Sequence, residues 1–266
     1  MKIVIINDTS GEYHVGCNAV MKSFVDLCKK FNLEIVEKIK RKQIMAGQKI
    51  PVANVIVING EGSLHHGGRN TEFFPKLLEE ASVPIILTNS VWDSVQFLNE
   101  KVIYNMNEKI IAASVRESRS LHQLREVYKG PIEVVPDLSF WQKIPVANVK
   151  RKGTGYSDCV RRRNTIQFEG SPNFRPLVRR PIPISWEEYT TWLQGLELFV
   201  TGRFHGLCMS VATVTPYQLI SSNCHKNEAL HEDVVSAGGA AAYSKNAREK
   251  IEKFWEKIAG GKYGEI

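Results

Sequence analysis

Short runs of β-branched residues alternate with stretches of helical spacing through the first half of this sequence. Lys2–Ile6 and Val52–Ile58 are strand-like, and apolar residues recur at helical spacing between them, over Asn18–Phe31. The alternation continues with a helix at Phe73–Ala81, strands at Val83–Thr88 and Ile110–Val115, a helix at Ser118–Tyr128 and a strand at Ile132–Val135. Strands that alternate with helices of about ten residues form βαβ units. The sequence therefore predicts an α/β fold with a parallel sheet.

Residues 141–180 interrupt this alternation. They are basic, contain Gly and Pro, and hold one short strand candidate, Thr165–Phe168. Ser185 then has the spacing of a helix cap. It begins a second series: a helix to Gln194, a strand at Leu198–Thr201, a helix at about 203–213, a strand at Tyr217–Ile220 and a last helix at about 244–258. We therefore expect two lobes, residues 1–140 and a smaller one at 141–266.

The composition excludes several classes of protein. Apolar residues make up 43% of the chain, which is enough for a core and argues against disorder. No run approaches the roughly 18 apolar residues of a membrane-spanning helix. The apolar stretch at the N-terminus is too short for a signal peptide. The five cysteines are odd in number and form no CxxC pair, so we expect a cytoplasmic protein with reduced thiols.

Positive charge is concentrated in residues 150–180. This segment holds nine Lys+Arg against two acidic residues. It is either a solvated basic loop or a surface that gathers anionic substrates. No helix-turn-helix, zinc-finger or RNP pattern accompanies the charge, so we expect no specific nucleic-acid partner.

Glycine-rich loops follow two of the expected strands. The loop at 59–68 contains four glycines, and ligands of an open parallel sheet bind outside the carboxyl ends of its strands. We therefore expect this loop to bind a ligand, with Glu61 as a base or hydroxyl anchor. The loop at 7–18 carries Gly11 and Gly16 before a helix, and it fits a structural turn as well as an anion site.

Two further strand ends carry arginine. Arg116 ends one strand, where it can bind a carboxylate or phosphate or pair with Glu117 on the surface. Arg203 and His205 lie between Gly202 and Gly206 at the start of a helix, whose free backbone N–H groups attract anions. We interpret this second segment as functional.

We expect no metal site. His14/Cys17 and His205/Cys208 each have an H-x-x-C spacing. Neither belongs to a paired zinc pattern.

Several segments, taken together and in order, resemble the polysaccharide pyruvyl transferase family. They are INGEGSL (58–64), VPIILTNS (83–90), SVRESRS (114–120), VVPDLSF (134–140) and residues 200–230 with the TGRFHG motif. The resemblance implies a GT-B-like fold of two Rossmann-like lobes with parallel sheets and an active site in the cleft between them. It also implies transfer of a pyruvyl group from phosphoenolpyruvate to a saccharide as a ketal, with no cofactor.

The resemblance assigns residues to the site. Arg116, Arg203 and His205 would lie at the donor. The other expected substrate-binding residues stand in the matching segments: Gly60, Gly62, Ser63, Asn89, Gly202, Gly206, Asn223 and Lys226.

The chemistry of this reaction fits the same residues. Phosphoenolpyruvate carries a carboxylate and a phosphate, which two arginines and a helix end can bind. The methylene carbon must be protonated, and His205 is the candidate acid or phosphate ligand. Glu61 or Asp8 would deprotonate the sugar hydroxyl.

Two other functions stay open. A GT-B-type glycosyltransferase would bind a nucleotide-sugar at the same helix ends, with Glu228 or Glu232 available for the ribose. A non-catalytic sugar- or anion-binding protein could keep the same fold. The acceptor sugar, which could be lipid-linked, and a homo-oligomeric state cannot be read from the sequence.

Overall fold

The chain divides into two compact units. A computed structural model describes residues 1–61, 72–93, 98–180 and 184–263. Unit 1 contains Met1–Thr9, Phe24–Pro136 and Lys250–Ile266, and unit 2 contains Ser10–Ser23 and Asp137–Glu249. Compared with a simple division at residue 140, residues 10–23 belong with the second unit and the chain from Lys250 belongs with the first.

Unit 1 is built on a six-stranded sheet in which every pairing is parallel. Its strands are β1 (Lys2–Ile6), β2 (Glu34–Ile39), β3 (Val55–Asn59), β4 (Ile85–Ser90), β5 (Ile110–Val115) and β6 (Ile132–Val134). The order β2-β1-β3-β4-β5-β6 reverses direction between β1 and β3. Ligands of such sheets bind at this switch point, beyond the carboxyl ends of the strands.

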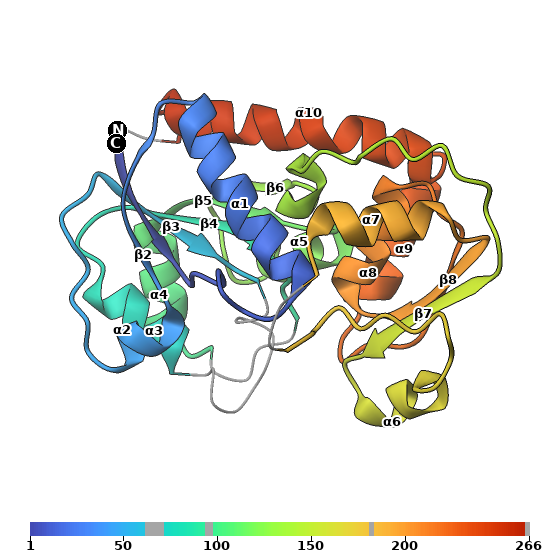
Figure 1. The fold of residues 1–266 in the computed structure, drawn as a ribbon. Coiled ribbons are helices and arrows are strands. Elements are labelled where there is room, and N and C mark those ends of the chain that lie inside the picture. The colour runs from blue at the N-terminus through green and yellow to red at the C-terminus, as the bar shows by residue number, and fades with distance from the viewer. Residues whose placement is uncertain (62–71, 94–97, 181–183, 264–266) are drawn as a thin grey trace. The chain divides into compact units, whose positions relative to one another are not determined.

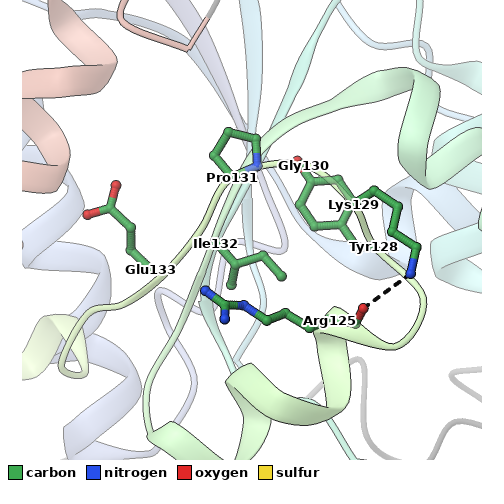
Figure 2. Close-up of a pocket in the computed structure, with 7 residues that line it drawn as sticks. All are labelled: Arg125, Tyr128, Lys129, Gly130, Pro131, Ile132 and Glu133. Atoms are coloured by element: carbon green, nitrogen blue, oxygen red, sulfur yellow. Dashed lines mark hydrogen bonds between the residues drawn. The ribbon is translucent and has the colours of Figure 1, made fainter.

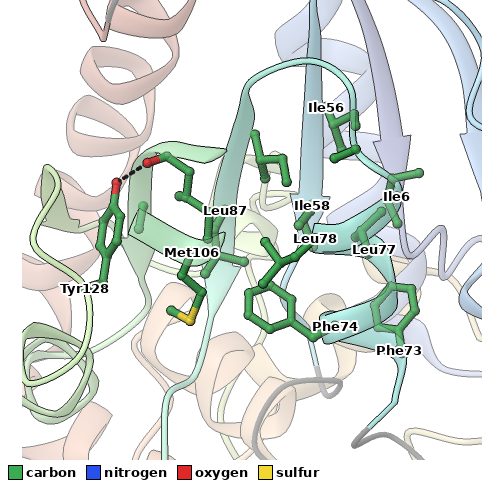
Figure 3. Packing of buried hydrophobic residues seen from close by; sticks show 14 of the residues in the cluster. Ile6, Ile56, Ile58, Phe73, Phe74, Leu77, Leu78, Leu87, Met106 and Tyr128 are labelled. Atoms are coloured by element: carbon green, nitrogen blue, oxygen red, sulfur yellow. Dashed lines mark hydrogen bonds between the residues drawn. The ribbon is translucent and has the colours of Figure 1, made fainter. Parts of the chain in front are cut away.

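Three helices cover one face of this sheet with apolar side chains. They are α3 (Phe73–Glu80), α4 (Glu100–Lys109) and α5 (Ser118–Arg125). Phe73, Phe74, Leu77 and Leu78 of α3 are completely buried against Ile58 and its neighbours (Figure 3). The Tyr128 hydroxyl closes this core by donating a 2.8 Å hydrogen bond to the Ile110 carbonyl. The burial of these apolar side chains is the main source of stability for the unit.

The other face of the sheet is covered by parts of two longer helices (Figure 1). These are α1 (Val15–Lys30) from Phe24 onward and α10 (Ala240–Ala259) from Lys250 onward. Phe24 and Trp255 meet edge to face with ring centroids 5.6 Å apart, and Lys30 pairs with Glu252. A short helix, α2 (Arg41–Met45), follows β2.

Unit 2 contains a smaller parallel sheet of order β7-β8-β9. Its strands and helices are β7 (Thr154–Cys159), α6 (Arg162–Thr165), α7 (Trp186–Gln194), β8 (Leu198–Gly202), α8 (Phe204–Ala212), β9 (Tyr217–Leu219) and α9 (Lys226–Ser236). The expected cap on α7 is confirmed, because the Ser185 hydroxyl accepts a 3.0 Å hydrogen bond from the Glu188 N–H. The mixed α/β class, the parallel sheets and the smaller second lobe are confirmed.

The strand expected at Thr165–Phe168 is wrong. Thr165 ends α6, and Ile166–Phe168 is a 3₁₀ turn. The Thr165 hydroxyl accepts a hydrogen bond from the Cys159 N–H, and Phe168 stacks on Tyr156 at 4.8 Å. Phe168 therefore packs against Tyr156 of β7 instead of forming a strand, and Ile166 is left exposed. No helix in the described parts of the chain is long and apolar enough to cross a membrane.

Replacing Leu77 with alanine should destabilise unit 1 by about 2–5 kcal/mol, because it leaves a cavity in a fully packed core. Urea unfolding followed by tryptophan fluorescence would measure this loss. Tyr104→Ala is the matched control on the neighbouring helix: Tyr104 is 64% exposed, and its removal should change the unfolding free energy by less than about 0.5 kcal/mol. Equal losses in the two variants would contradict the assigned core.

Candidate functional site

His205 lies in the first turn of α8, directly after β8, and is buried. Its Nε2 is 3.6 Å from Oδ2 of Asp137, which is 1% exposed. The Ser139 N–H donates a 2.9 Å hydrogen bond to the other oxygen of Asp137 and so fixes the carboxylate. A proton on His205 would therefore face a buried negative charge, which is the arrangement an acid–base histidine needs.

A second histidine stands against His205. The rings of His14 and His205 meet edge to face with centroids 5.1 Å apart. His14 Nδ1 accepts a 3.1 Å hydrogen bond from the Gly16 N–H, so the neutral ring carries its proton on Nε2. Burial lowers the pKa of His14 well below 6.5, and the charges of His205, Arg203 and Lys226 lower it further against the opposing effect of Asp137. His14 is therefore neutral at pH 7.

The contact between α1 and His205 requires glycine at position 16. An ideal Cβ on Gly16 would lie 2.1 Å from Cγ of His205 and 2.5 Å from its Nδ1. Any side chain there would collide with the ring. Gly16, the second glycine of the loop, therefore allows α1 to pack closely against the pair of His14 and His205.

Asp158, at the end of β7, fixes Arg203. The Arg203 Nε donates a 2.8 Å hydrogen bond to Asp158 Oδ2, and Nη2 lies 2.5 Å from the same oxygen. The Leu177 N–H donates to the other oxygen at 2.7 Å. The Arg203 side chain remains 24% exposed, so it is oriented by Asp158 and still accessible from solvent.

Lys226 and Asn223 are brought together at the start of α9. The Lys226 Nζ donates a 2.8 Å hydrogen bond to Asn223 Oδ1. Lys226 is only 7% exposed, and its charge contributes to lowering the pKa of His14. Burial of an ammonium group is costly unless negative charge is near it. Lys226 therefore adds a second fixed cation to the neighbourhood of the two histidines.

This histidine cluster, made of His14, Arg203, His205 and Lys226, suits an anion better than a cation. His14, Cys17 and His205 each place a potential ligand atom within 4.8 Å of the others, so a soft metal ion could be held there. Nδ1 of His14 is already used by Gly16, however, and the positive charges of Arg203 and Lys226 oppose a divalent cation. The expectation of no metal stays a prediction.

The predicted residues of unit 1 form a polar group at the switch point of its sheet. The Asn7 side chain donates to the carbonyls of Asn59 (2.7 Å) and Glu61 (3.2 Å). Thr9 donates to a carboxylate oxygen of Glu61 at 3.2 Å, and Asn89 donates to Asn59 Oδ1 at 3.2 Å. Asn7 and Asn89 both adopt positive φ, of 67° and 56°. Asn89 and Glu61 therefore belong to one buried network, and Asp8 follows Asn7 in the same loop.

Gly60 and Arg116 flank this network at the ends of β3 and β5. An ideal Cβ on Gly60 would lie 1.7 Å from the Ser90 hydroxyl, so only glycine fits beside β4. Arg116 is 2% exposed, and its N–H donates a 2.9 Å hydrogen bond to the Ser90 carbonyl. The surface position considered for Arg116 is therefore wrong, because the residue is buried; Glu117 caps α5 through Ser120.

The remaining predicted residues differ in what the structure says of them. Gly62 and Ser63 lie outside the described residues. Gly202 and Gly206 have a packing role, because an ideal Cβ would lie 2.8 Å from Cys159 Sγ and 2.3 Å from Thr201 Oγ1, respectively. Their contact with substrate stays a prediction.

Sequence reasoning did not identify His14, Asp137 or Asp158 as site residues. Asp137 directly follows a strand and a proline, which was the one available signal.

A pocket of about 480 Å³ in unit 1 lies elsewhere (Figure 2). Its lining runs from Arg125 to Glu133, at the start of β6, which is the amino end of a parallel strand. Glu133 is already paired with Lys257 at 2.7 Å. The pocket contains none of the predicted residues and lies at the edge of the sheet where ligands of this fold do not bind.

The depressed pKa of His14 predicts a dependence of stability on pH. Below about pH 6.5 His14 is protonated in the unfolded chain but stays neutral in the folded protein. The free energy of unfolding should therefore fall as the pH decreases from about 7.5 to about 5.5. His14→Asn keeps a helix-capping acceptor and should show less of this fall in urea unfolding. His122→Asn, at an exposed histidine, should behave like the parent protein. An unchanged pH dependence in His14→Asn would contradict the assignment.

Comparison with known proteins places this geometry in context. Solved structures of similar fold include an uncharacterised protein from Klebsiella pneumoniae (14% identity, TM-score 0.59, 88% of each chain covered). Others are the UDP-GlcNAc 2-epimerase of Methanocaldococcus jannaschii in complex with UDP-GlcNAc and UDP (11% identity, TM-score 0.56, 98% of this chain and 99% of that one) and a putative UDP-N-acetylglucosamine 2-epimerase from Listeria monocytogenes (11% identity, TM-score 0.53, 99% and 92%). At these identities the likeness extends to the fold alone, which is GT-B-like.

None of the curated proteins matches the sequence. The sequence profile of one family, polysaccharide pyruvyl transferase, matches residues 14–216, which is well over half of the chain. The matched range includes His14, Arg116, Arg203 and His205. This chain belongs to the polysaccharide pyruvyl transferase family.

Proposed function

We propose that this protein transfers a pyruvyl group from phosphoenolpyruvate to two hydroxyls of a saccharide. The observation that carries the proposal is the histidine cluster of unit 2, in a chain of this family. Arg203 and Lys226 are held by Asp158 and Asn223, and His205 begins a helix beside them. Fixed cations and a helix N-terminus are what an anionic donor requires.

Phosphoenolpyruvate presents two anions, and the chain offers a fixed cation for each. Arg203 has the planar fork that binds a carboxylate or phosphate through two hydrogen bonds. Lys226 supplies a point charge. Arg116 of unit 1 is the further donor ligand that the family motif implies, and its burial at the end of β5 is the position at which a ligand of a parallel sheet would bind.

The reaction proceeds in two steps at C2 of the enolpyruvyl group, an addition followed by a substitution. An acceptor hydroxyl adds to C2 as its proton leaves to a base, while the C3 methylene takes a proton and becomes a methyl group. A second hydroxyl then forms a bond to C2 as the C2–O bond to phosphate breaks; its proton passes to the departing group, which leaves as inorganic phosphate, and the ketal remains. We assign the proton donated to C3 to His205, whose Nε2 lies 3.6 Å from the carboxylate of Asp137. We assign the base to Glu61 or Asp8.

A nucleotide-sugar donor is the second candidate, and one observation favours it. Oε2 of Glu228, in the first turn of α9, is shielded from solvent and has no hydrogen-bond partner among the described residues. Buried carboxylate oxygens are normally satisfied, and a ribose hydroxyl would satisfy this one. Glu232 is exposed and is the weaker choice for the same role.

Ligand-induced stabilisation separates the two donors. Phosphoenolpyruvate at roughly a hundredfold excess over its Kd should raise the unfolding free energy by about 2.7 kcal/mol, seen as a higher Tm. Arg203→Gln and Arg116→Gln should each lose this shift. Arg125→Gln, an exposed arginine of unit 1, should retain it. A shift with UDP-GlcNAc that phosphoenolpyruvate does not produce, and that Glu228→Gln abolishes, would replace the pyruvyl donor with a nucleotide-sugar.

His205→Asn should reduce turnover by about 10²–10⁴-fold while phosphoenolpyruvate still raises the Tm, because proton transfer is lost and the cations remain. Release of inorganic phosphate in the presence of candidate acceptors would measure turnover. His231→Asn, an exposed histidine that contacts Tyr217, is the control and should keep full activity. Binding of phosphoenolpyruvate by the parent protein with no phosphate release from any acceptor would favour a non-catalytic binding protein.

A further inference from the structure

The net charge of the chain comes entirely from residues 150–180. The chain carries 35 Lys+Arg and 28 Asp+Glu, a net of 35 − 28 = +7. The segment alone carries nine basic and two acidic residues, so its net charge is 9 − 2 = +7, and the rest of the chain has 26 of each sign. The rest of the chain therefore has no net charge, and the excess of positive charge lies in one segment of unit 2.

Five of the nine basic residues are exposed arginines of the segments 161–163 and 179–180, and three of them have no structural use within the described residues. Arg161, Arg163 and Arg179 are exposed, and their side chains form no ion pair or hydrogen bond with any described residue. Arg162 pairs with Glu169 only at 3.6 Å, and Arg180 lies over the ring of Tyr13. The fold therefore does not need these cations for its own stability, and they remain available to a partner.

The backbone brings these residues to one part of unit 2. Arg161–Arg163 follow the carboxyl end of β7, and α6 projects beyond that end in Figure 1. The returning chain pairs beside β7: the Arg175 N–H donates to the Tyr156 carbonyl, and the Leu177 N–H donates to Asp158. Arg179 then donates its N–H to the carbonyl of Tyr13.

Apolar side chains are exposed among the same arginines. Val160 precedes Arg161, Ile166 follows α6, and Val178 precedes Arg179. Their exposed fractions are 37%, 57% and 37%, and Tyr13 beside them is 38% exposed. We call this group the arginine surface, and its members are Tyr13, Val160, Arg161, Arg162, Arg163, Ile166, Val178, Arg179 and Arg180.

The combination of exposed arginines and exposed apolar side chains distinguishes a membrane with anionic lipids from nucleic acid as the partner of this surface. Nucleic acid is bound by arginines together with aromatic side chains that stack on bases. The aromatic side chain of the arginine surface, Tyr13, already stacks with Arg180, and the exposed aliphatic side chains contribute nothing to phosphate contacts. At an anionic membrane, arginines are attracted to the headgroups while valine and isoleucine side chains enter the boundary of the acyl region. We propose that the arginine surface docks unit 2 onto a membrane that carries anionic lipid headgroups.

Docking would bring the site close to a lipid surface. Val178 of the arginine surface forms a β-bridge with His14, a member of the histidine cluster. A substrate attached to lipid would then meet the cluster without leaving the membrane. Lipid binding itself needs no pyruvyl chemistry, so it can be tested without assuming the proposed function.

Co-sedimentation with vesicles tests the proposal. The full chain is mixed with vesicles of phosphatidylcholine alone or of phosphatidylcholine with phosphatidylglycerol, and binding is expected only to the second. Each basic residue near such a surface contributes about fivefold to partitioning, so Arg161→Gln/Arg163→Gln/Arg179→Gln should bind about 100-fold more weakly. Lys38→Gln/Lys42→Gln/Lys49→Gln removes the same charge from exposed lysines of unit 1 and should bind like the parent protein.

A second variant tests the apolar part of the surface. Ile166→Ser leaves every charge in place and should still weaken vesicle binding, whereas binding to duplex DNA should be unaffected by it. Thermal unfolding of each variant establishes that the fold is retained.

Three results would each overturn the proposal. The first is no binding of the parent protein to anionic vesicles. The second is equal weakening in the arginine and lysine variants. The third is displacement of bound protein from vesicles by DNA of equal phosphate concentration together with unchanged vesicle binding of Ile166→Ser.

Discussion

The carboxylate of Asp158 joins the three segments from which unit 2 builds its site. It ends β7, holds the guanidinium of Arg203 at the end of β8, and accepts the Leu177 N–H of the chain that returns beside β7. The pair is mostly buried, so loss of the acid would leave Arg203 without its partner in a poorly solvated place, a costly arrangement. The positions of Arg203, a member of the histidine cluster, and of the returning chain therefore depend on this one ion pair.

The sequence predicted elements wherever burial follows from apolar residues alone. The expected bounds of β1 and β5 agree residue for residue with the structure, because Ile3–Ile6 and most of Ile110–Val115 are apolar and buried on both faces of the sheet. β7 was missed because its residues, TGYSDC, are mostly polar: Ser157 is buried through its hydrogen bond to Thr201 and Asp158 through Arg203. Their partners lie more than forty positions away, and local pattern carries no information about them.

The candidate site divides in the same way. Arg203 and His205 were found because glycines and a helix start mark them in the sequence. Asp137 and His14 were missed because each is a candidate site residue only through its contact with His205, which is distant in the chain and adjacent in space. Glycine was the ambiguous signal: at positions 60, 202 and 206 it reflects close packing against Ser90, Cys159 and Thr201. Glycines at the strand ends of the candidate site are therefore explained in part by close packing of the backbone against neighbouring side chains.

The absence of a side chain at position 16 couples two positions that are far apart in the sequence. The ring of His205 occupies the space that a Cβ on residue 16 would need. Among natural relatives, a larger residue at position 16 can therefore be accepted only together with a smaller residue at position 205, or with a shift of α1 away from α8. Glycine and histidine at these two positions should accordingly be inherited as a pair, and divergence at one of them should mark the lineages in which the chemistry of the histidine cluster has changed.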